Sequence, residues 1–311
     1  MKIHFVFLHI CLLLFSFTYI YSQPKQIKEF EGVKRINGTE IFCKVIGTGK
    51  PIIIVHGGPG LAHDYLFEPF KQLANSYTLI FFDQRGCGRS SEFSDADTIK
   101  MSDLVEDLEG VRNIFNIDKM ILAGQSWGAL VSIEYASKYP GNVSKLLLLE
   151  PAPGSTKYLG EFQNTIMQRL SKADKEKISQ LAQNPELKFN PILFKEFMAT
   201  RFKGYSTDTT FIAQMHMDYF DSLRVKKFFA SSAEFGSYLL NFDLYDKMES
   251  IDTPTLIIHG QYDPIPTSSI EKMSGAINSS ELHIINGSGH FVHLEKPNEY
   301  FSLIRYFLSK E

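Results

Sequence analysis

The sequence predicts an α/β protein in which helices flank a mostly parallel central sheet and a helical insertion interrupts the second half. Three observations lead to this prediction. Short, continuous apolar runs recur along the chain, as is typical of strands buried on both faces of a sheet. Segments of helix length separate these runs, and such alternation favours a parallel sheet covered on both sides. The alternation stops near Pro151 and returns near Pro254.

The core is expected to begin with residues 23–153. Residues 26–46 alternate in polarity around Asn37-Gly38, which predicts an antiparallel hairpin. Continuous apolar runs then predict buried strands at 51–57, 77–83, 119–125 and 143–150. Helices are expected at 102–115 and 127–139, the second ending at Pro140-Gly141.

The insertion is expected to span residues 154–248. This stretch is charged, helix-prone and rich in Phe, Met and Tyr, which predicts a helical cap over one end of the sheet. The core resumes at 249–311, with strands at 254–260 and 281–286 and a closing helix from about Pro297 to Leu308.

The N-terminus differs in character from the rest of the chain. Lys2 precedes an apolar stretch that extends to about Ile20, and the polar sequence YSQPKQ follows. This order is typical of a secretory signal peptide, so we expect residues 1–22 to be removed after Ser22. An uncleaved membrane anchor is the alternative, because the stretch is nearly long enough to span a bilayer. The mature chain is expected to be periplasmic or extracellular, without stable membrane association.

Composition limits the classes of partner. Charged residues make up 22% of the 311 residues and the formal net charge is -3. This balance excludes the basic surface of a nucleic-acid-binding protein and the charge excess of a disordered chain. We therefore expect a small peptide or acyl substrate and no nucleic acid. The two cysteines that remain after cleavage, Cys43 and Cys87, do not make a disulfide framework, so free buried thiols are expected.

The hexapeptide GQSWGA, residues 124–129, contains the only tryptophan. A Gly-x-Ser-x-Gly sequence alone is a weak signal, because glycine and serine are common. Here it lies between a predicted buried strand and a helix that starts at once, the arrangement of a nucleophile elbow. Glycines are needed beside the serine because this turn is too tight for side chains. We therefore expect Ser126 to be a catalytic nucleophile.

A serine nucleophile needs a base that is itself oriented by a carboxylate. Asp263 and His290 each follow a late predicted strand, in the chain order Ser, Asp, His that this elbow requires. We expect Ser126, Asp263 and His290 to form a triad. Glu150 is the competing acid, since it ends the strand after the elbow helix. His293 is expected to be a packing or surface residue.

The tetrahedral intermediate also needs two backbone donors for its oxyanion. One is expected to be the N–H of Trp127, directly after the nucleophile. The other is expected in the glycine-rich loop HGGPG, residues 56–60, and is assigned to Gly58. His56 is expected to hold this loop rather than to act in catalysis. The histidines show no metal-ligand spacing and the mechanism needs no cofactor, so neither a metal nor a cofactor is expected.

Five ordered motifs resemble the proline iminopeptidase family of α/β-hydrolases. They are HGGPG with AHDYL (56–66), FDQRGCGRS (82–90), GQSWG (124–128), GQYD (260–263) and GSGH (287–290). The resemblance implies the α/β-hydrolase fold and the same roles for the triad and for Gly58 and Trp127. Asp83 and Arg85 are expected to brace a loop.

The resemblance also implies how the cap binds substrate. Proline iminopeptidases hold the free amino terminus of their substrate with cap carboxylates, one of them a Glu shortly before a His-Tyr-Phe-like sequence. The similar stretch here is MHMDYF, residues 215–220, and it places His216 where that Glu would be. Asp218 or Glu234 is the expected substitute.

Three functions follow from these residues. The first is a secreted serine aminopeptidase that releases N-terminal proline or small apolar residues from short peptides. The second is a carboxylesterase or amidase that acts on small apolar acyl substrates. The third, disfavoured by the complete triad, is a non-catalytic binding protein on the same fold.

Overall fold

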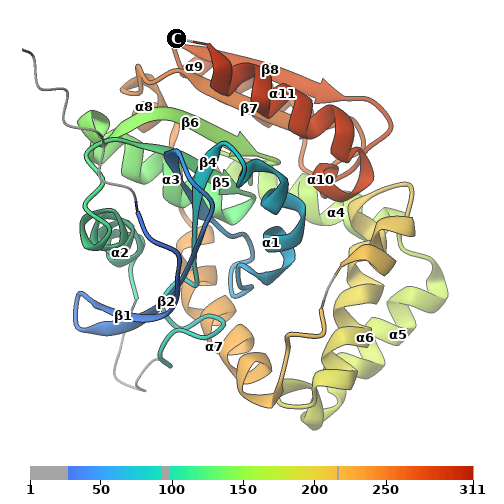
Figure 1. Cartoon of the computed structure of the whole chain (residues 1–311). Coiled ribbons are helices and arrows are strands. Elements are labelled where there is room, and N and C mark those ends of the chain that lie inside the picture. The colour runs from blue at the N-terminus through green and yellow to red at the C-terminus, as the bar shows by residue number, and fades with distance from the viewer. Residues whose placement is uncertain (1–26, 93–98, 216, 311) are drawn as a thin grey trace, which may run out of the picture.

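The computed structural model describes residues 27–92, 99–215 and 217–310 (Figure 1). The predicted signal peptide and His216 lie outside the described residues. Eight strands form one sheet in the order β1-β2-β4-β3-β5-β6-β7-β8. Strand β2 pairs antiparallel with β1 and β4, and the remaining neighbours are parallel. The predicted fold class is confirmed.

The strands lie where the hairpin pattern and the apolar runs predicted them. Their bounds are β1 (Phe30–Ile36), β2 (Thr39–Ile46), β3 (Lys50–Val55), β4 (Tyr77–Phe82), β5 (Met120–Gln125), β6 (Val143–Leu149), β7 (Thr255–Gly260) and β8 (Ser280–Ile285). The predicted hairpin turn is also confirmed, with φ of 48° at Asn37 and 80° at Gly38. Positive φ at both turn residues matches the right-handed twist of the flanking strands.

Helices cover both faces of the sheet (Figure 1). The core helices are α1 (Asp64–Phe70), α2 (Met101–Ile114), α3 (Trp127–Lys138), α9 (Thr267–Ala276), α10 (Val292–Glu295) and α11 (Pro297–Ser309). Successive residues of a strand point to opposite faces, so Ile53 and Val55 pack in the cluster that contains α2 and α3. Ile52 and Ile54 pack in the cluster that contains α1 and α11.

The insertion forms the helices α4 (Leu159–Arg169), α5 (Lys172–Gln183), α6 (Pro191–Phe202), α7 (Ser222–Leu239) and α8 (Tyr245–Glu249). Helices α5 and α6 lie side by side away from the sheet (Figure 1). The insertion leaves and rejoins the core at one place, because the Thr156 N–H donates to the Phe242 carbonyl (3.0 Å) and the Leu244 N–H to the Gly154 carbonyl (2.9 Å). Helix α8 packs beside α3 and α9 in the core.

Both described cysteines, Cys43 and Cys87, are free and buried, as expected. Burial raises the pKa of each thiol to about 12. Among the described residues, no helix has the length and apolar character needed to cross a membrane.

Candidate active site

Ser126 lies at the sharp turn between β5 and α3, and its backbone is strained. Its φ is 53°, in a region that non-glycine residues rarely adopt. The neighbouring glycines are required by close backbone contacts. A Cβ on Gly128 would lie 2.2 Å from the Val55 carbonyl oxygen, and one on Gly124 would lie 2.4 Å from the Gly128 carbonyl oxygen. The turn therefore presents the serine at the end of the sheet.

The structure brings the three predicted triad side chains together. His290 Nε2 lies 3.0 Å from Ser126 Oγ, and His290 Nδ1 lies 2.8 Å from Asp263 Oδ2. Asp263 follows β7 and His290 follows β8, so all three residues lie at the carboxyl ends of parallel strands. Both partners are buried. A proton on Nδ1 donates to the carboxylate and leaves Nε2 to accept from the serine hydroxyl.

The competing acid, Glu150, does not contact His290. Its Oε2 lies 3.5 Å from Gln125 Nε2, and its Oε1 has no hydrogen-bond partner among the described residues. Complete burial, followed by the nearby Asp263 carboxylate, raises the pKa of Glu150 well above its ordinary value. Burial thus favours the neutral form of Glu150, whereas Asp263 is the acid in contact with the histidine.

The two predicted oxyanion donors border the same pocket as Ser126. Trp127 is the first residue of α3, where backbone N–H groups have no partner within the helix. Gly58 has a φ of 131° in the loop after β3. The neighbouring Gly57 N–H already donates to the Tyr65 hydroxyl (2.7 Å), which in turn donates to Gln125 Oε1 (2.7 Å).

The Trp127 ring has a separate task. Its Nε1–H donates to Gln84 Oε1 (3.0 Å), and the ring stacks on Phe235 of the cap with centroids 5.6 Å apart. The ring therefore packs cap helix α7 against the core.

The loops behind the site are braced as the sequence predicted. His56 is fully buried, lies 2.8 Å from the Gly57 carbonyl oxygen and accepts from the Gln84 N–H at 3.0 Å. Arg85 makes two hydrogen bonds of 2.6 Å to Asp107. His293 is a packing residue, since it lies between the rings of Tyr65 and Tyr300.

Asp83 also braces a loop, and it belongs to the one described cluster whose geometry suits a metal ion, His63, Asp64 and Asp83. Asp83 Oδ1 accepts from the His63 backbone N–H (2.9 Å) and lies 2.7 Å from His63 Nδ1. Asp83 Oδ2 accepts from the Arg89 N–H (2.8 Å). These bonds tie the segments that contain His63 and Arg89 to Asp83 at the end of β4.

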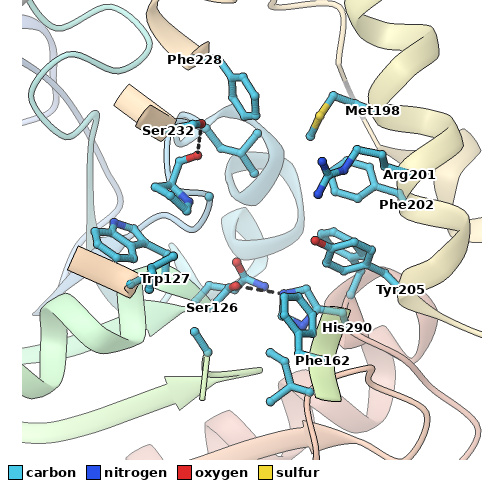
Figure 2. Close-up of a pocket in the computed structure, with 18 of the residues that line it drawn as sticks. Ser126, Trp127, Phe162, Met198, Arg201, Phe202, Tyr205, Phe228, Ser232 and His290 are labelled. Carbon is cyan, nitrogen blue, oxygen red and sulfur yellow. Dashed lines mark hydrogen bonds between the residues drawn. The ribbon is translucent and has the colours of Figure 1, made fainter. Parts of the chain in front are cut away.

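A cavity of about 350 Å³ opens above Ser126 (Figure 2). Its walls are mostly apolar, and the cap contributes most of the rings: Phe162, Phe197, Phe202, Tyr205, Phe228 and Phe229. Helix α7 is tied to the glycine-rich loop, because Ser232 Oγ donates to the Pro59 carbonyl (3.0 Å). The cavity thus has a floor from the sheet and walls from the cap.

The structure does not bring the predicted cap carboxylates to this cavity. Asp218 is 86% exposed and pairs with Lys195 outside the cavity. Glu234 is partly buried on α7 and does not line the cavity. None of the described lining residues is a carboxylate, whereas one, Arg201 of α6, is a cation. Helical spacing from the apolar residues Phe197 and Met198 is the signal that could have found Arg201.

Comparisons with known proteins agree with the fold described above. The family model described as alpha/beta hydrolase fold matches residues 50–297. The chain is 28% identical to a proline iminopeptidase of Saccharolobus solfataricus, over 95% of this chain and 97% of the relative, and 27% identical to one of Thermoplasma volcanium, over 90% and 97%. The resemblance to proline iminopeptidases is confirmed.

Solved structures of differently named enzymes have the same fold. A proline iminopeptidase of Mycobacterium smegmatis superposes with a TM-score of 0.68 at 20% identity, covering 90% of this chain and 97% of that one. An esterase of Exiguobacterium antarcticum superposes with a TM-score of 0.68 at 23% identity, covering 90% and 100%. The fold alone therefore does not choose between peptide and ester substrates.

Proposed function

The chain belongs to the alpha/beta hydrolase fold family, and from this membership we propose that it is a serine hydrolase with Ser126 as nucleophile, His290 as base and Asp263 as orienting acid. The observation that carries the proposal is the hydrogen-bonded series from Asp263 through His290 to Ser126 at the floor of a closed-in cavity. A complete series of this kind disfavours a non-catalytic binding protein.

In the proposed mechanism, His290 Nε2 takes the proton of Ser126 Oγ as that oxygen attacks the substrate carbonyl carbon. Asp263 stabilises the imidazolium that forms. The N–H groups of Gly58 and Trp127 donate to the developing oxyanion, each contributing about 3 to 4 kcal/mol. The bond to the leaving group then breaks, and His290 gives its proton to that group. Water hydrolyses the acyl-serine by the same route.

We infer that the substrate is a short peptide from which proline or another small apolar residue is released at the N-terminus. The names of the relatives support this inference. The cavity supports it as well, because its size and apolar rings suit a small apolar acyl group.

A carboxylesterase or amidase for blocked acyl substrates is the second candidate. One observation favours it: the described lining residues supply no carboxylate to hold a free ammonium group. An aminopeptidase requires that free amine, whereas an esterase or amidase does not. The two candidates therefore differ in their response to N-acylation of the substrate.

The nucleophile is tested by Ser126→Ala, with Ser137→Ala on the same helix as the control. Ser137 lies on the outer side of α3 and hydrogen-bonds to Ser250. Hydrolysis is expected to fall by at least about 10⁴-fold in Ser126→Ala and to stay unchanged in Ser137→Ala. Near-normal turnover by a folded Ser126→Ala protein would refute the proposal.

The substrate is tested by comparing proline p-nitroanilide, its N-acetyl derivative and p-nitrophenyl butyrate. If the protein is an aminopeptidase, proline p-nitroanilide should be cleaved rapidly and its N-acetyl derivative should not. Equal or faster cleavage of the N-acetyl derivative would exclude an aminopeptidase and select the second candidate.

We also propose that residues 1–22 are removed on export and that the mature protein is periplasmic or extracellular. The apolar stretch after Lys2 and the polar residues that follow it support this proposal. Sequencing the N-terminus of the protein from its native cells tests it, and an intact Met1 would contradict it.

A further inference from the structure

Arg201 is the only charged cap side chain among the described residues that line the catalytic cavity. It follows Phe197 by one helical turn on α6, and its guanidinium lies 5.6 Å from the centre of that ring. Figure 2 shows the guanidinium directed into the cavity, beside Met198 and above Tyr205. Arg201 is solvent-exposed, and a guanidinium at the edge of an apolar cavity can bind a carboxylate through its planar set of donors.

No carboxylate of the described residues forms an ion pair with Arg201. Other cations of the cap do have such partners. Lys195 pairs with Asp218, Lys203 with Asp174 and Lys177 with Glu196, and these pairs do not line the catalytic cavity. Arg201 therefore differs from its neighbours in facing the cavity with its donors available to a ligand.

Arg201 lies on the His290 side of the cavity. It precedes Tyr205 by one turn, and the Tyr205 carbonyl accepts from the His290 backbone N–H at 3.0 Å. The two rings are 5.4 Å apart between centroids. Because His290 donates the proton to the leaving group, the leaving group must depart on this side.

We propose that Arg201 binds a carboxylate carried by the leaving group of the substrate. The inference rests on the proposed serine hydrolase function. It assigns the substrate class as small amides or esters that join an apolar acyl group to an acidic leaving group, such as an amino acid with a free α-carboxylate. A guanidinium binds a carboxylate through two parallel hydrogen bonds, which also orients the scissile bond over Ser126.

The chemistry of the step is that of the proposed mechanism. The acyl carbon forms a bond to Ser126 Oγ as its bond to the leaving nitrogen or oxygen breaks. The proton from His290 neutralises that atom, while the carboxylate stays ionised on Arg201 until the product departs. Water then supplies the atoms that complete the free acid and restore Ser126.

Matched esters test the proposal. The 3- and 4-carboxyphenyl butyrates carry the charge on the leaving group, and each is compared with its carboxamide. Arg201→Gln is expected to lower the ratio of kcat/KM for carboxylate over carboxamide by about tenfold relative to wild type. Phenyl hydrogen adipate and phenyl adipamate carry the same difference on the acyl side, and their ratio is expected to stay unchanged.

Two control variants separate direct binding from general electrostatics and folding. Lys195→Gln removes the same charge from the same helix outside the cavity, and we expect no change in either ratio. Arg201→Lys is expected to keep part of the preference, because a point charge remains. Turnover of the neutral carboxamide esters reports whether each variant is folded.

The outcomes are distinct. If the wild type hydrolysed none of these esters and anilides, the proposed function itself would be contradicted. Normal wild-type hydrolysis with an unchanged carboxylate ratio in Arg201→Gln would overturn the role of Arg201 alone. A change on the acyl-side pair that equals or exceeds the change on the leaving-group pair would overturn the assigned side.

Discussion

The sheet core and the helical cap meet at one cavity, but their side chains are fixed by different means. In the core, Ser126 is held by a strained turn between glycines that have no room for a Cβ. In the cap, rings such as Phe162 and Phe228 face the cavity from helical segments whose outer sides are exposed. The difference indicates that the core fixes the chemistry, whereas the cap can change its lining and thereby its substrate.

The core and the cap also differ in where their titratable side chains lie. In the core, burial raises the pKa of Glu150 well above its ordinary value and lowers that of His293 to about 3, which favours the neutral form of each. The cap instead carries ion pairs at its surface, such as Lys195 with Asp218. Stability of the core should therefore depend on pH, and that of the cap surface should depend on it only weakly.

The largest expected effect separates the two acids of the core. Asp263→Asn should lower kcat by about 10⁴-fold without unfolding the protein, because the histidine loses its orienting carboxylate. Glu150→Gln should leave kcat within a few-fold, since Glu150 does not contact His290. Steady-state kinetics with p-nitrophenyl butyrate checks both variants. A greater loss in Glu150→Gln would reverse the assignment of the acid.

The next effect compares two glycines. Gly128→Ala should lower the free energy of unfolding by about 3 kcal/mol or more, because its Cβ would overlap the Val55 carbonyl. Gly236→Ala in cap helix α7 should raise it by about 0.5 to 1 kcal/mol, since no atom lies within 4 Å of its Cβ. Urea denaturation measures the free energy of unfolding of both variants. Similar changes in the two would contradict the proposed difference between core and cap.

The pH effect is assigned to His293. Burial, with a smaller contribution from His290, lowers its pKa from an ordinary 6.5 to about 3, so the folded protein keeps it neutral. The unfolded chain binds a proton below about pH 6.5, and stability is therefore lost as the pH falls from there toward 3. His293→Gln should reduce the loss between pH 6.5 and 4.5 by about 2 to 3 kcal/mol.

The control for this effect is His283→Gln on β8, where the side chain is 37% exposed. Urea denaturation at the two pH values should give the same loss for His283→Gln and wild type. Equal losses for His293→Gln and wild type would show that His293 is not a source of the acid sensitivity.

The smallest effect concerns a cap residue that the sequence placed near substrate. Asp218→Asn should change the free energy of unfolding by less than about 0.5 kcal/mol, because its pair with Lys195 is exposed. Its kcat/KM for proline p-nitroanilide should equal that of wild type. A clear rise in KM in Asp218→Asn would show that Asp218 contributes to substrate binding.

The same division explains what the sequence could predict. Ser126, Asp263 and His290 each follow a buried strand, and parallel strands bring their carboxyl ends to one edge, so linear order was enough to place them together. Asp218 was placed by its likeness to a motif. Whether the side chain of Asp218 or of Arg201 faces the cavity depends on how the cap packs on the sheet. Local sequence spacing does not determine that packing.

The most direct test of the account is covalent labelling with a fluorophosphonate, followed by mass spectrometry of the peptides. Two serines that line the cavity are available for comparison, Ser126 of the core and Ser232 of the cap. One phosphonyl adduct per chain is expected, on Ser126, and none in Ser126→Ala. An adduct on Ser232, or hydrolysis by a chain that the probe does not label, would contradict it.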